Sequence, residues 1–380
     1  MELDAFLLKY YKLKSRIAPF RLKQDFETQK TVEVITRLLD RAETVHSGAD
    51  VNGRYGVTAG HNIENYMERA ERYILALERG EYPLKGMFAE PGRALIDHSF
   101  VEKDGKLHVF YICATIGYEW DTRQTDFLGH AVTEDLINWQ ICPPCITVEP
   151  DGPDEHQVWA PGVAKKGDTY YMYYTGVNIN IAQSICLATS KDLYHWEKFE
   201  NNPVVLPGDW GEWSEDKWSD CRDAMVLVEE DTAYMYYCTA KKHSDGTLHA
   251  ALGVASSDDM YKWKDEGAYE FDICDFALES PFVLRHNDKY YLFYTNCGHG
   301  TSYAVSDNAI DGWKSLGMLI EKNGVPLCPA NVPSCAEVFE FKGKWYISCC
   351  ERQPGCEQYL EIFEFIWNDD GTASVGKRIE

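Results

Sequence analysis

The sequence predicts an all-β protein, a five-bladed β-propeller that follows an α-helical N-terminal segment. Two observations predict this fold. A hairpin pattern occurs five times, in which a short apolar run, a polar turn and an aromatic-rich run follow one another. After each of the first four copies comes a second motif, a strand-like run with a polar turn and a Trp. Two motifs that recur in one order indicate a true internal repeat.

The five hairpins share turns rich in Asp, Gly, Asn and Lys between runs of Val, Phe, Tyr and Trp. They are IDHSFVEKDGKLHVFYI from Ile96, VWAPGVAKKGDTYYMYYTG from Val158, RDAMVLVEEDTAYMYYCT from Arg222, ESPFVLRHNDKYYLFYT from Glu279 and CAEVFEFKGKWYISCC from Cys335. Aligned on their turns, they begin at Asp97, Trp159, Asp223, Glu279 and Cys335, which gives steps of 62, 64, 56 and 56 residues. Four short strands in such a step are typical of a propeller blade. The motif tryptophans should lie between blades, at Trp139, Trp196, Trp263 and Trp313.

The N-terminal segment differs from the repeats. We expect residues 1–85 to be helical and residues 86–380 to form the propeller. Residues 31–45 and 62–80 carry apolar side chains at three- and four-residue spacing, the pattern of an amphipathic helix. The apolar stripes are expected to pack on the propeller rim. A dimer contact, which would make the protein a homo-oligomer, and a lid over the site are the alternatives.

Charge and cysteine usage narrow the partners and the compartment. The chain has a net charge of −24 and lacks the excess of Lys and Arg with which proteins bind nucleic acids and anionic membranes. No apolar run has the length of a secretory signal or a membrane span. Most of the 13 cysteines fall within strand patterns, where they act as small hydrophobes in a reducing compartment. The expectation is a cytoplasmic protein.

Three acids stand at the leading ends of hairpin copies one, three and four. In a propeller the innermost strands begin near the axis, so Asp97, Asp223 and Glu279 should meet in one pocket. Like charges raise one another's pKa, and such an arrangement serves a site where one acid must stay protonated. Glycoside hydrolysis uses one carboxylic acid and one carboxylate in this way. The alternative is structural, with the aspartates capping strands and Glu279 in an ion pair.

The phrases IDHSFVEKDGKLHVFY, VWAPGV, RDAMVLV and ESPFVLRHNDKYYLFY resemble the five-bladed furanosidase superfamily. This superfamily includes the arabinanases and xylosidases of glycoside hydrolase family 43 and the invertase-like families 32, 68 and 117. The resemblance implies that Asp97 is the nucleophile or the general base, that Asp223 tunes pKa and stabilises the transition state, and that Glu279 is the general acid. It leaves retention or inversion of configuration open. It also makes Arg222, directly before Asp223, a ligand of sugar hydroxyls in fork geometry.

The resemblance has gaps. Ile96-Asp97-His98-Ser99 replaces the invertase signature Asn-Asp-Pro-Asn-Gly, and Gly162 replaces the acid of the arabinanase Trp-Ala-Pro-Asp. Cys335 stands where arabinanase-like families tend to have a His that touches a central ion or water. A structural ion in the central channel is therefore doubtful. No metal or other cofactor is expected to be required.

Aromatic and polar residues near the leading ends are candidate sugar contacts. Trp159 is the first candidate to pack on a sugar ring, followed by Trp120 in the loop GYEWDTRQTD. Asp121, His98 and Arg352 are candidates for hydroxyl contacts. For Trp159 a rim position is an equal alternative, and for the others it is the favoured one.

The resulting hypothesis is a glycoside hydrolase that removes terminal furanose or pentose units from small oligosaccharides by carboxylate acid/base catalysis. A transglycosylase or phosphorylase on the same fold is the alternative enzyme, although a phosphorylase needs a cationic phosphate site, for which only Arg222 and His98 stand out. A non-catalytic carbohydrate-binding propeller is the third reading. It predicts the loss of an acid, and all three acids are present.

Overall fold

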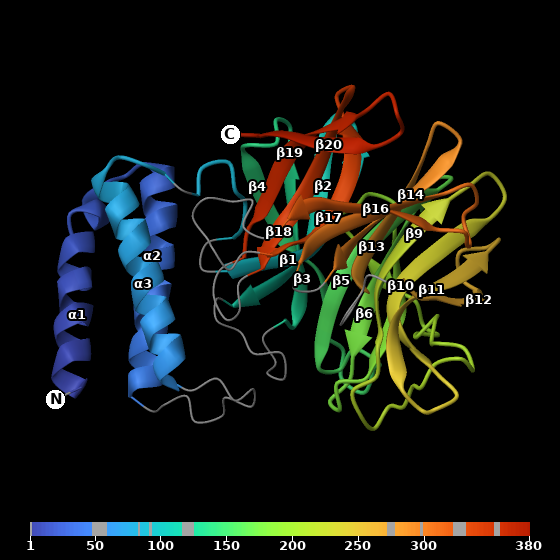
Figure 1. Ribbon diagram of the computed structural model, residues 1–380, viewed down its shortest axis with the longest axis horizontal. Helices are drawn as coiled ribbons and strands as arrows, with labels where there is room; N and C mark the ends of the chain where they lie inside the picture. Colours follow the sequence, from blue (N-terminus) through green and yellow to red (C-terminus); the bar gives the residue numbers. More distant parts are fainter. Residues whose placement is uncertain are drawn as a thin grey trace.

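The computed structural model describes residues 2–47, 59–82, 84–90, 93–115, 125–271, 278–296, 299–321, 332–352 and 358–380. Three helices come first, α1 (Glu2–Ile17), α2 (Phe26–His46) and α3 (Ala59–Glu78), with the short 3-10 helix η1 (Phe20–Leu22) between α1 and α2. Five four-stranded sheets follow, and Figure 1 shows the helices beside them. The expected fold class, a five-bladed propeller behind an N-terminal helical segment, is confirmed.

Each blade is an antiparallel meander in chain order. Blade one contains β1 (Arg93–Lys103), β2 (Lys106–Thr115), β3 (Phe127–Thr133) and β4 (Trp139–Thr147). Blade two contains β5 (Gln157–Lys166), β6 (Thr169–Val177), β7 (Gln183–Ser190) and β8 (Glu197–Lys198). Blade three contains β9 (Cys221–Val228), β10 (Ala233–Lys242), β11 (Leu248–Ser257) and β12 (Lys264–Tyr269). Blade four contains β13 (Leu278–His286), β14 (Lys289–Asn296), β15 (Gly300–Ser306) and β16 (Lys314–Glu321). Blade five contains β17 (Val332–Phe341), β18 (Lys344–Arg352), β19 (Leu360–Trp367) and β20 (Ala373–Arg378).

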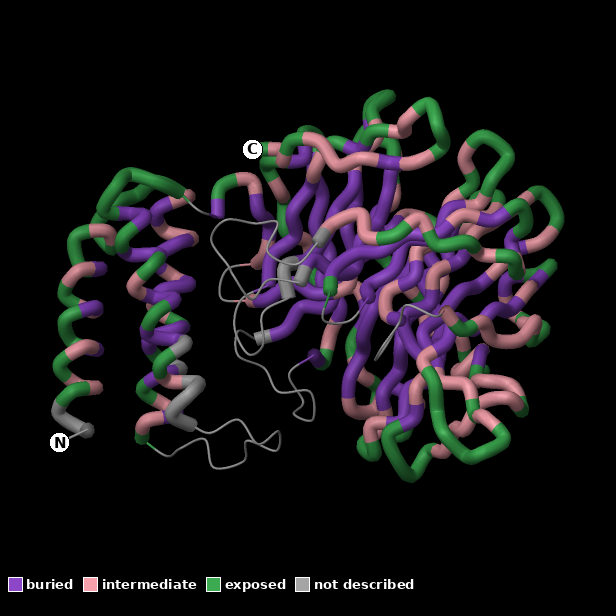
Figure 2. Tube along the Cα trace, in the orientation of Figure 1, coloured by how far each residue is buried: buried purple, intermediate pink, exposed green. Residues whose placement is uncertain are grey.

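The first strands of the blades form the hub. Each contacts the first strand of the next blade, and β17 contacts β1, which closes the ring. Apolar faces of neighbouring sheets pack together between the blades, so buried residues run through every inner strand (Figure 2). The hub strands are therefore held from both sides, which fixes the positions of the side chains at the axis.

The repeated Trp motif joins neighbouring blades, as expected. Trp196 packs edge-on against Phe110 at a ring distance of 5.4 Å, and Trp263 packs in the same way against Tyr173 of the preceding blade. Trp313 does so against Tyr236 at 6.3 Å. Such edge-to-face pairs add stability beyond the apolar area that they bury.

Every hub strand carries a β-bulge at the same position, and this corrects the alignment of the repeats. The pairing with the second strand shifts at Asp97, Ala160, Asp223, Ser280 and Cys335. The last four have positive φ angles of 39°, 59°, 49° and 59°. In blades two and four the bulge residues are Ala160 and Ser280. The alignment on turns used Trp159 and Glu279, which stand one position earlier. A bulge adds one residue to one strand and breaks the period of two, which an alignment on turns does not detect.

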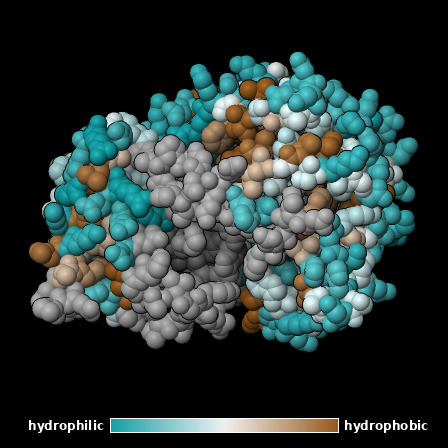
Figure 3. Space-filling view, in the orientation of Figure 1, coloured by the Kyte–Doolittle hydropathy of each residue, from teal (hydrophilic) through white to brown (hydrophobic). Residues whose placement is uncertain are grey.

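The helices have a core of their own, formed by apolar residues of α1, α2 and α3 together with Leu84, Met87 and Tyr359. Lys30 of α2 donates to the carbonyl oxygens of Leu84, at 2.7 Å, and Met87. Tyr359 belongs to blade five, so the helices touch the propeller there. Leu8 and Tyr11 are 75% and 62% exposed, and Figure 3 shows apolar side chains on the helical part as well as on the upper part of the propeller. No helix among the described residues is long and apolar enough to cross a membrane.

Candidate active site

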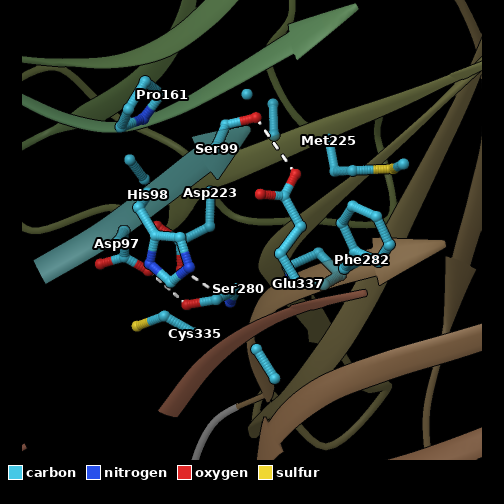
Figure 4. Close-up of a pocket in the computed structure, with 15 residues that line it drawn as sticks. Asp97, His98, Ser99, Pro161, Asp223, Met225, Ser280, Phe282, Cys335 and Glu337 are labelled. Atoms are coloured by element: carbon cyan, nitrogen blue, oxygen red, sulfur yellow. Dashed lines mark hydrogen bonds between the residues drawn. The ribbon is translucent and has the colours of Figure 1, made fainter. Parts of the chain in front are cut away.

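Five tripeptides surround a small cavity at the propeller axis, one from each bulge. They are Asp97-His98-Ser99, Ala160-Pro161-Gly162, Asp223-Ala224-Met225, Ser280-Pro281-Phe282 and Cys335-Ala336-Glu337. The cavity measures about 40 Å³. It has room for about three water molecules but not for a sugar ring. Figure 4 shows Asp97, Asp223 and Ser280 close together at one side of it.

Ser280 connects the two aspartates. Its hydroxyl donates a short hydrogen bond to Asp97 Oδ1, and its backbone N–H donates to Asp223 Oδ2 at 3.0 Å. Ser280 directly follows Glu279 in the chain. The dipeptide Glu279-Ser280 therefore carries one acid and hydrogen-bonds to the other two. Ser280 makes both hydrogen bonds from a backbone conformation with a positive φ of 49°. Sequence reasoning missed this residue, although the pair Glu279-Ser280 was visible.

Arg222 connects Glu279 to the same group. Its guanidinium donates to Glu279 Oε1 at 3.0 Å and lies 3.7 Å from Asp223 Oδ2. It also pairs with Asp220 and donates to Gln183 Oε1 at 3.1 Å. Arg222 is only 8% exposed, so its charge acts in a low-dielectric environment. Asp220 and Gln183 were not among the candidates from sequence, and only their closeness to Arg222 in space reveals them.

The electrostatics of the acids favour a proton on Asp223. Burial raises the pKa of Asp223 to about 8, the charge of Asp97 also raises it, and Arg222 lowers it. Asp223 is thus protonated at neutral pH. Asp97 accepts a hydroxyl hydrogen bond, an interaction that stabilises a carboxylate. The raised pKa of Asp223 favours a proton on this acid, whereas the resemblance assigns the general acid role to Glu279.

Two predicted sugar contacts are buried. The Trp159 side chain is 3% exposed and its indole N–H donates to Thr125 Oγ1 at 2.9 Å, so its ring offers little surface to a sugar. His98 lines the cavity, but its Nε2 lies 2.6 Å from Ser348 Oγ and its Nδ1 lies 3.3 Å from Cys350 Sγ. Burial lowers the pKa of His98 to about 3, so the ring is neutral. Both residues pack the hub in this structure, and their contacts to sugar stay predictions.

The other three predicted contacts cannot be placed. Trp120 and Asp121 lie outside the described residues, and of Arg352 only the backbone, in β18, is described. The predicted roles of all three stay predictions.

The cavity-lining side chains do not suit a central hard cation. Such an ion prefers about six to eight oxygen ligands. Here Cys335 supplies sulfur, and both nitrogens of His98 contact protein groups. The carboxylate of Glu337 accepts from Ser99 Oγ at 3.2 Å and from Phe100 N at 2.7 Å. No step proposed below involves an ion.

Glu337 is a buried acid at the cavity that sequence reasoning missed. Burial raises the pKa of its carboxyl to about 8, since its two hydrogen bonds only partly offset the lost hydration. Unfolded glutamate has a pKa near 4.3. The folded state therefore holds this proton over a range in which the unfolded chain releases it. The stability gained in this way is complete below about pH 4.3 and is lost as pH rises through about 8.

The neutral variant Glu337→Gln should flatten this pH dependence. Wild type loses up to about 1.4 kcal/mol per pH unit from this group. Between pH 5.5 and 7.5 the free energy of unfolding of the variant should therefore improve by roughly 2–3 kcal/mol relative to wild type. Urea unfolding at both pH values measures it, with the exposed Glu340→Gln as the control. Parallel behaviour of wild type and Glu337→Gln would show that Glu337 is ionised throughout.

A closed five-bladed propeller with acids at the hub of blades one, three and four is the architecture of the furanosidase superfamily. Residues 97–289, just over half of the chain, match the family described as Glycosyl hydrolases family 32 N-terminal domain. The chain belongs to this family, and its resemblance to the furanosidase propellers is confirmed.

Known proteins of several activities are similar to this chain. A bifunctional 6(G)-fructosyltransferase/2,1-fructan:2,1-fructan 1-fructosyltransferase of Allium cepa is 40% identical over 168 residues, which cover 42% of this chain and 24% of the relative. An extracellular endo-alpha-(1->5)-L-arabinanase of Thermotoga petrophila is 28% identical over 29% of this chain and 22% of its own length. The chain thus spans about a quarter of these two relatives. A crystal structure of a thermostable family-43 glycoside hydrolase shares the fold, with a TM-score of 0.58 and 19% identity over 76% of this chain and 95% of that one.

Proposed function

We propose that this protein is a glycoside hydrolase that removes terminal furanose or pentose units from small oligosaccharides. One observation carries the proposal. The peptide Glu279-Ser280 supplies one acid and hydrogen-bonds to the other two, Asp97 and Asp223. Burial and, after it, the neighbouring charge of Asp97 raise the pKa of Asp223, as expected where carboxyl groups are held together in a catalytic site. Membership of the family 32 glycosyl hydrolases supports the reaction class.

The three acids take separate roles in this proposal. Asp97, held by the Ser280 hydroxyl, attacks the anomeric carbon or takes a proton from the attacking water. Glu279 protonates the leaving oxygen, and a proton on its Oε2 is compatible with the Arg222 bond to Oε1. Asp223 is neutral near pH 7 and donates a hydrogen bond to a sugar hydroxyl as positive charge develops on the ring.

Arg222 positions the acids and contacts a substrate hydroxyl. The Arg222 guanidinium pairs with the carboxylates of Asp220, Asp223 and Glu279. A sugar hydroxyl that displaces one of these carboxylates would still accept a hydrogen bond from the charged guanidinium. The natural substrate is a small oligosaccharide, the location is cytoplasmic, and no cofactor is needed. These three statements are part of the proposal.

A substrate screen tests the function. Purified wild type is incubated with 4-nitrophenyl α-L-arabinofuranoside, 4-nitrophenyl β-D-xyloside and fructose oligomers, and released sugar is quantified. The matched control is the double variant Asp97→Asn/Glu279→Gln, prepared identically, which reveals contaminating glycosidases. Release by wild type alone on at least one substrate is expected. Sugar phosphate formed only with added phosphate would instead indicate a phosphorylase, and inactivity on every substrate would contradict the proposal.

A further inference from the structure

A cluster of two imidazoles and one carboxylate lies at one end of blade three. His243 follows β10, His249 is the second residue of β11 and Glu270 follows β12. Because Thr239 of β10 pairs with Cys221 at the start of β9, these residues lie at the same end of the blade as Arg222 and Asp223. We call these three residues the His-His-Glu cluster. Their side chains are 38%, 52% and 29% exposed, so an ion in solution can reach them.

The donor atoms converge on one carboxylate oxygen. His243 Nε2 lies 2.8 Å and His249 Nδ1 lies 3.5 Å from Glu270 Oε2, and all three donor atoms lie within 4.8 Å of one another. The two rings stack at 4.1 Å with an interplanar angle of 23°. In a tetrahedral zinc site with bonds of about 2.0–2.1 Å, ligand atoms lie about 3.3–3.4 Å apart. The two nitrogen–oxygen distances, 2.8 and 3.5 Å, lie on either side of this ligand–ligand distance.

The hydrogen bonds of Thr247 favour one tautomer of His249, in which Nδ1 faces Glu270. The Thr247 hydroxyl lies 2.7 Å from Asp245 Oδ1, so its single proton goes to that carboxylate. Thr247 Oγ1 can then only accept from His249 Nε2, which lies 3.2 Å away. A neutral His249 would therefore direct the lone pair of its Nδ1 at Glu270 Oε2. A proton or a metal ion between the two acceptors removes this repulsion.

We propose that the His-His-Glu cluster binds a divalent transition-metal ion of the zinc class. Imidazole with carboxylate suits Zn²⁺, Co²⁺, Ni²⁺ and Cu²⁺, whereas Ca²⁺ and Mg²⁺ prefer all-oxygen sites. The hydrogen-bond chain from Asp245 through Thr247 holds His249 in the tautomer that a ligand requires, which is how outer-shell groups tune metal sites. Lys241 Nζ lies 3.7 Å from Glu270 Oε1, the other carboxylate oxygen, so Glu270 Oε2 is the oxygen that would coordinate the ion. Water completes the coordination.

Titration of the metal-free full-length protein with Zn²⁺ and Co²⁺ by calorimetry at pH 7.5 tests this site. One ion per chain is expected to bind. His249→Ala and Glu270→Gln should each weaken binding at least about 10-fold, and Thr247→Val should weaken it about 10-fold through the lost outer-shell bond. Binding should also weaken at pH 5.5, because protons compete for the imidazoles.

Two controls separate this site from other ligands. His195→Ala removes an exposed His that pairs with Asp192 at 2.7 Å, and Cys142→Ser removes a partly buried thiol near Cys145. Both variants should bind the ion as wild type does. Wild type that binds no ion, or equal binding by wild type, His249→Ala and Glu270→Gln, would overturn the proposal. The result does not depend on glycosidase activity.

Discussion

The variant Asp97→Asn should lose on the order of 10⁴-fold or more in kcat, while its melting temperature stays equal to or above that of wild type. Asn has nearly the shape of Asp but can neither attack an anomeric carbon nor accept a proton from water. The substitution also removes a negative charge beside Asp223, whose pKa should fall from about 8 toward the ordinary range. Steady-state kinetics and thermal unfolding of the same preparation measure both effects.

A smaller change at Ser280 is the companion experiment. Ser280→Ala leaves all three acids in place but deletes the hydroxyl that donates to Asp97. A hydrogen bond to a charged group is worth about 1.5–3 kcal/mol, so the loss in kcat/KM should be roughly 10- to 100-fold. The acidic limb of the pH–rate profile of Ser280→Ala should also move to higher pH, because the carboxylate of Asp97 loses a hydrogen bond that stabilises it.

An Asp97→Asn protein that is active, or that is inactive only because it unfolds, would contradict the role given to Asp97.

The variant Glu279→Gln should separate substrates by their leaving groups. A sugar alcohol leaves poorly without a proton, so kcat on oligosaccharides should fall about 10²- to 10⁴-fold. A 2,4-dinitrophenolate leaves without protonation, so the rate on a dinitrophenyl glycoside should fall less than about 10-fold. Gln keeps an acceptor for the Arg222 guanidinium, which lies 3.0 Å from Glu279 Oε1, so the geometry of the site is preserved.

The ratio of the two rates is the diagnostic. Protein lost to misfolding lowers both rates equally, whereas loss of an acid lowers only the oligosaccharide rate. Arg222→Lys serves as the contrast, because a point charge cannot replace the fork shared among Asp220, Asp223 and Glu279. It should lower both rates. An equal loss on the two substrates in Glu279→Gln would remove Glu279 from the general acid role.

The propeller could be predicted because its signals are local and repeated. Turn residues between aromatic strands mark each hairpin, and the motif residues Trp196, Trp263 and Trp313 each pack on an aromatic ring of the preceding blade. The bulges could not be read in this way, since one residue in positive φ leaves no clear mark in composition. The alignment therefore placed Trp159 and Glu279 one position early. The helix α1 lies within residues 1–85, which were expected to be helical, although the helical spacing was identified only for residues 31–45 and 62–80.

The acids of the candidate site could be predicted from the sequence, but the residues that hydrogen-bond to them and position them could not. Asp97, Asp223 and Glu279 stand out by residue type at repeated positions. Ser280 does not, because its effect comes from backbone geometry that turns its hydroxyl and N–H toward two carboxylates. Burial was the least readable property. Trp159 and His98 were candidate sugar contacts, and both are buried in this structure, so their contacts to sugar stay predictions.

The most direct test of this account is the crystal structure of the Asp97→Asn protein with the oligosaccharide that wild type cleaves fastest. The anomeric carbon of the terminal unit should lie within about 3.5 Å of the side chain at position 97. In the same complex the glycosidic oxygen should lie within about 3.2 Å of Glu279. A sugar seated elsewhere on the propeller, with position 97, Asp223 and Glu279 out of its reach, would contradict the central claim.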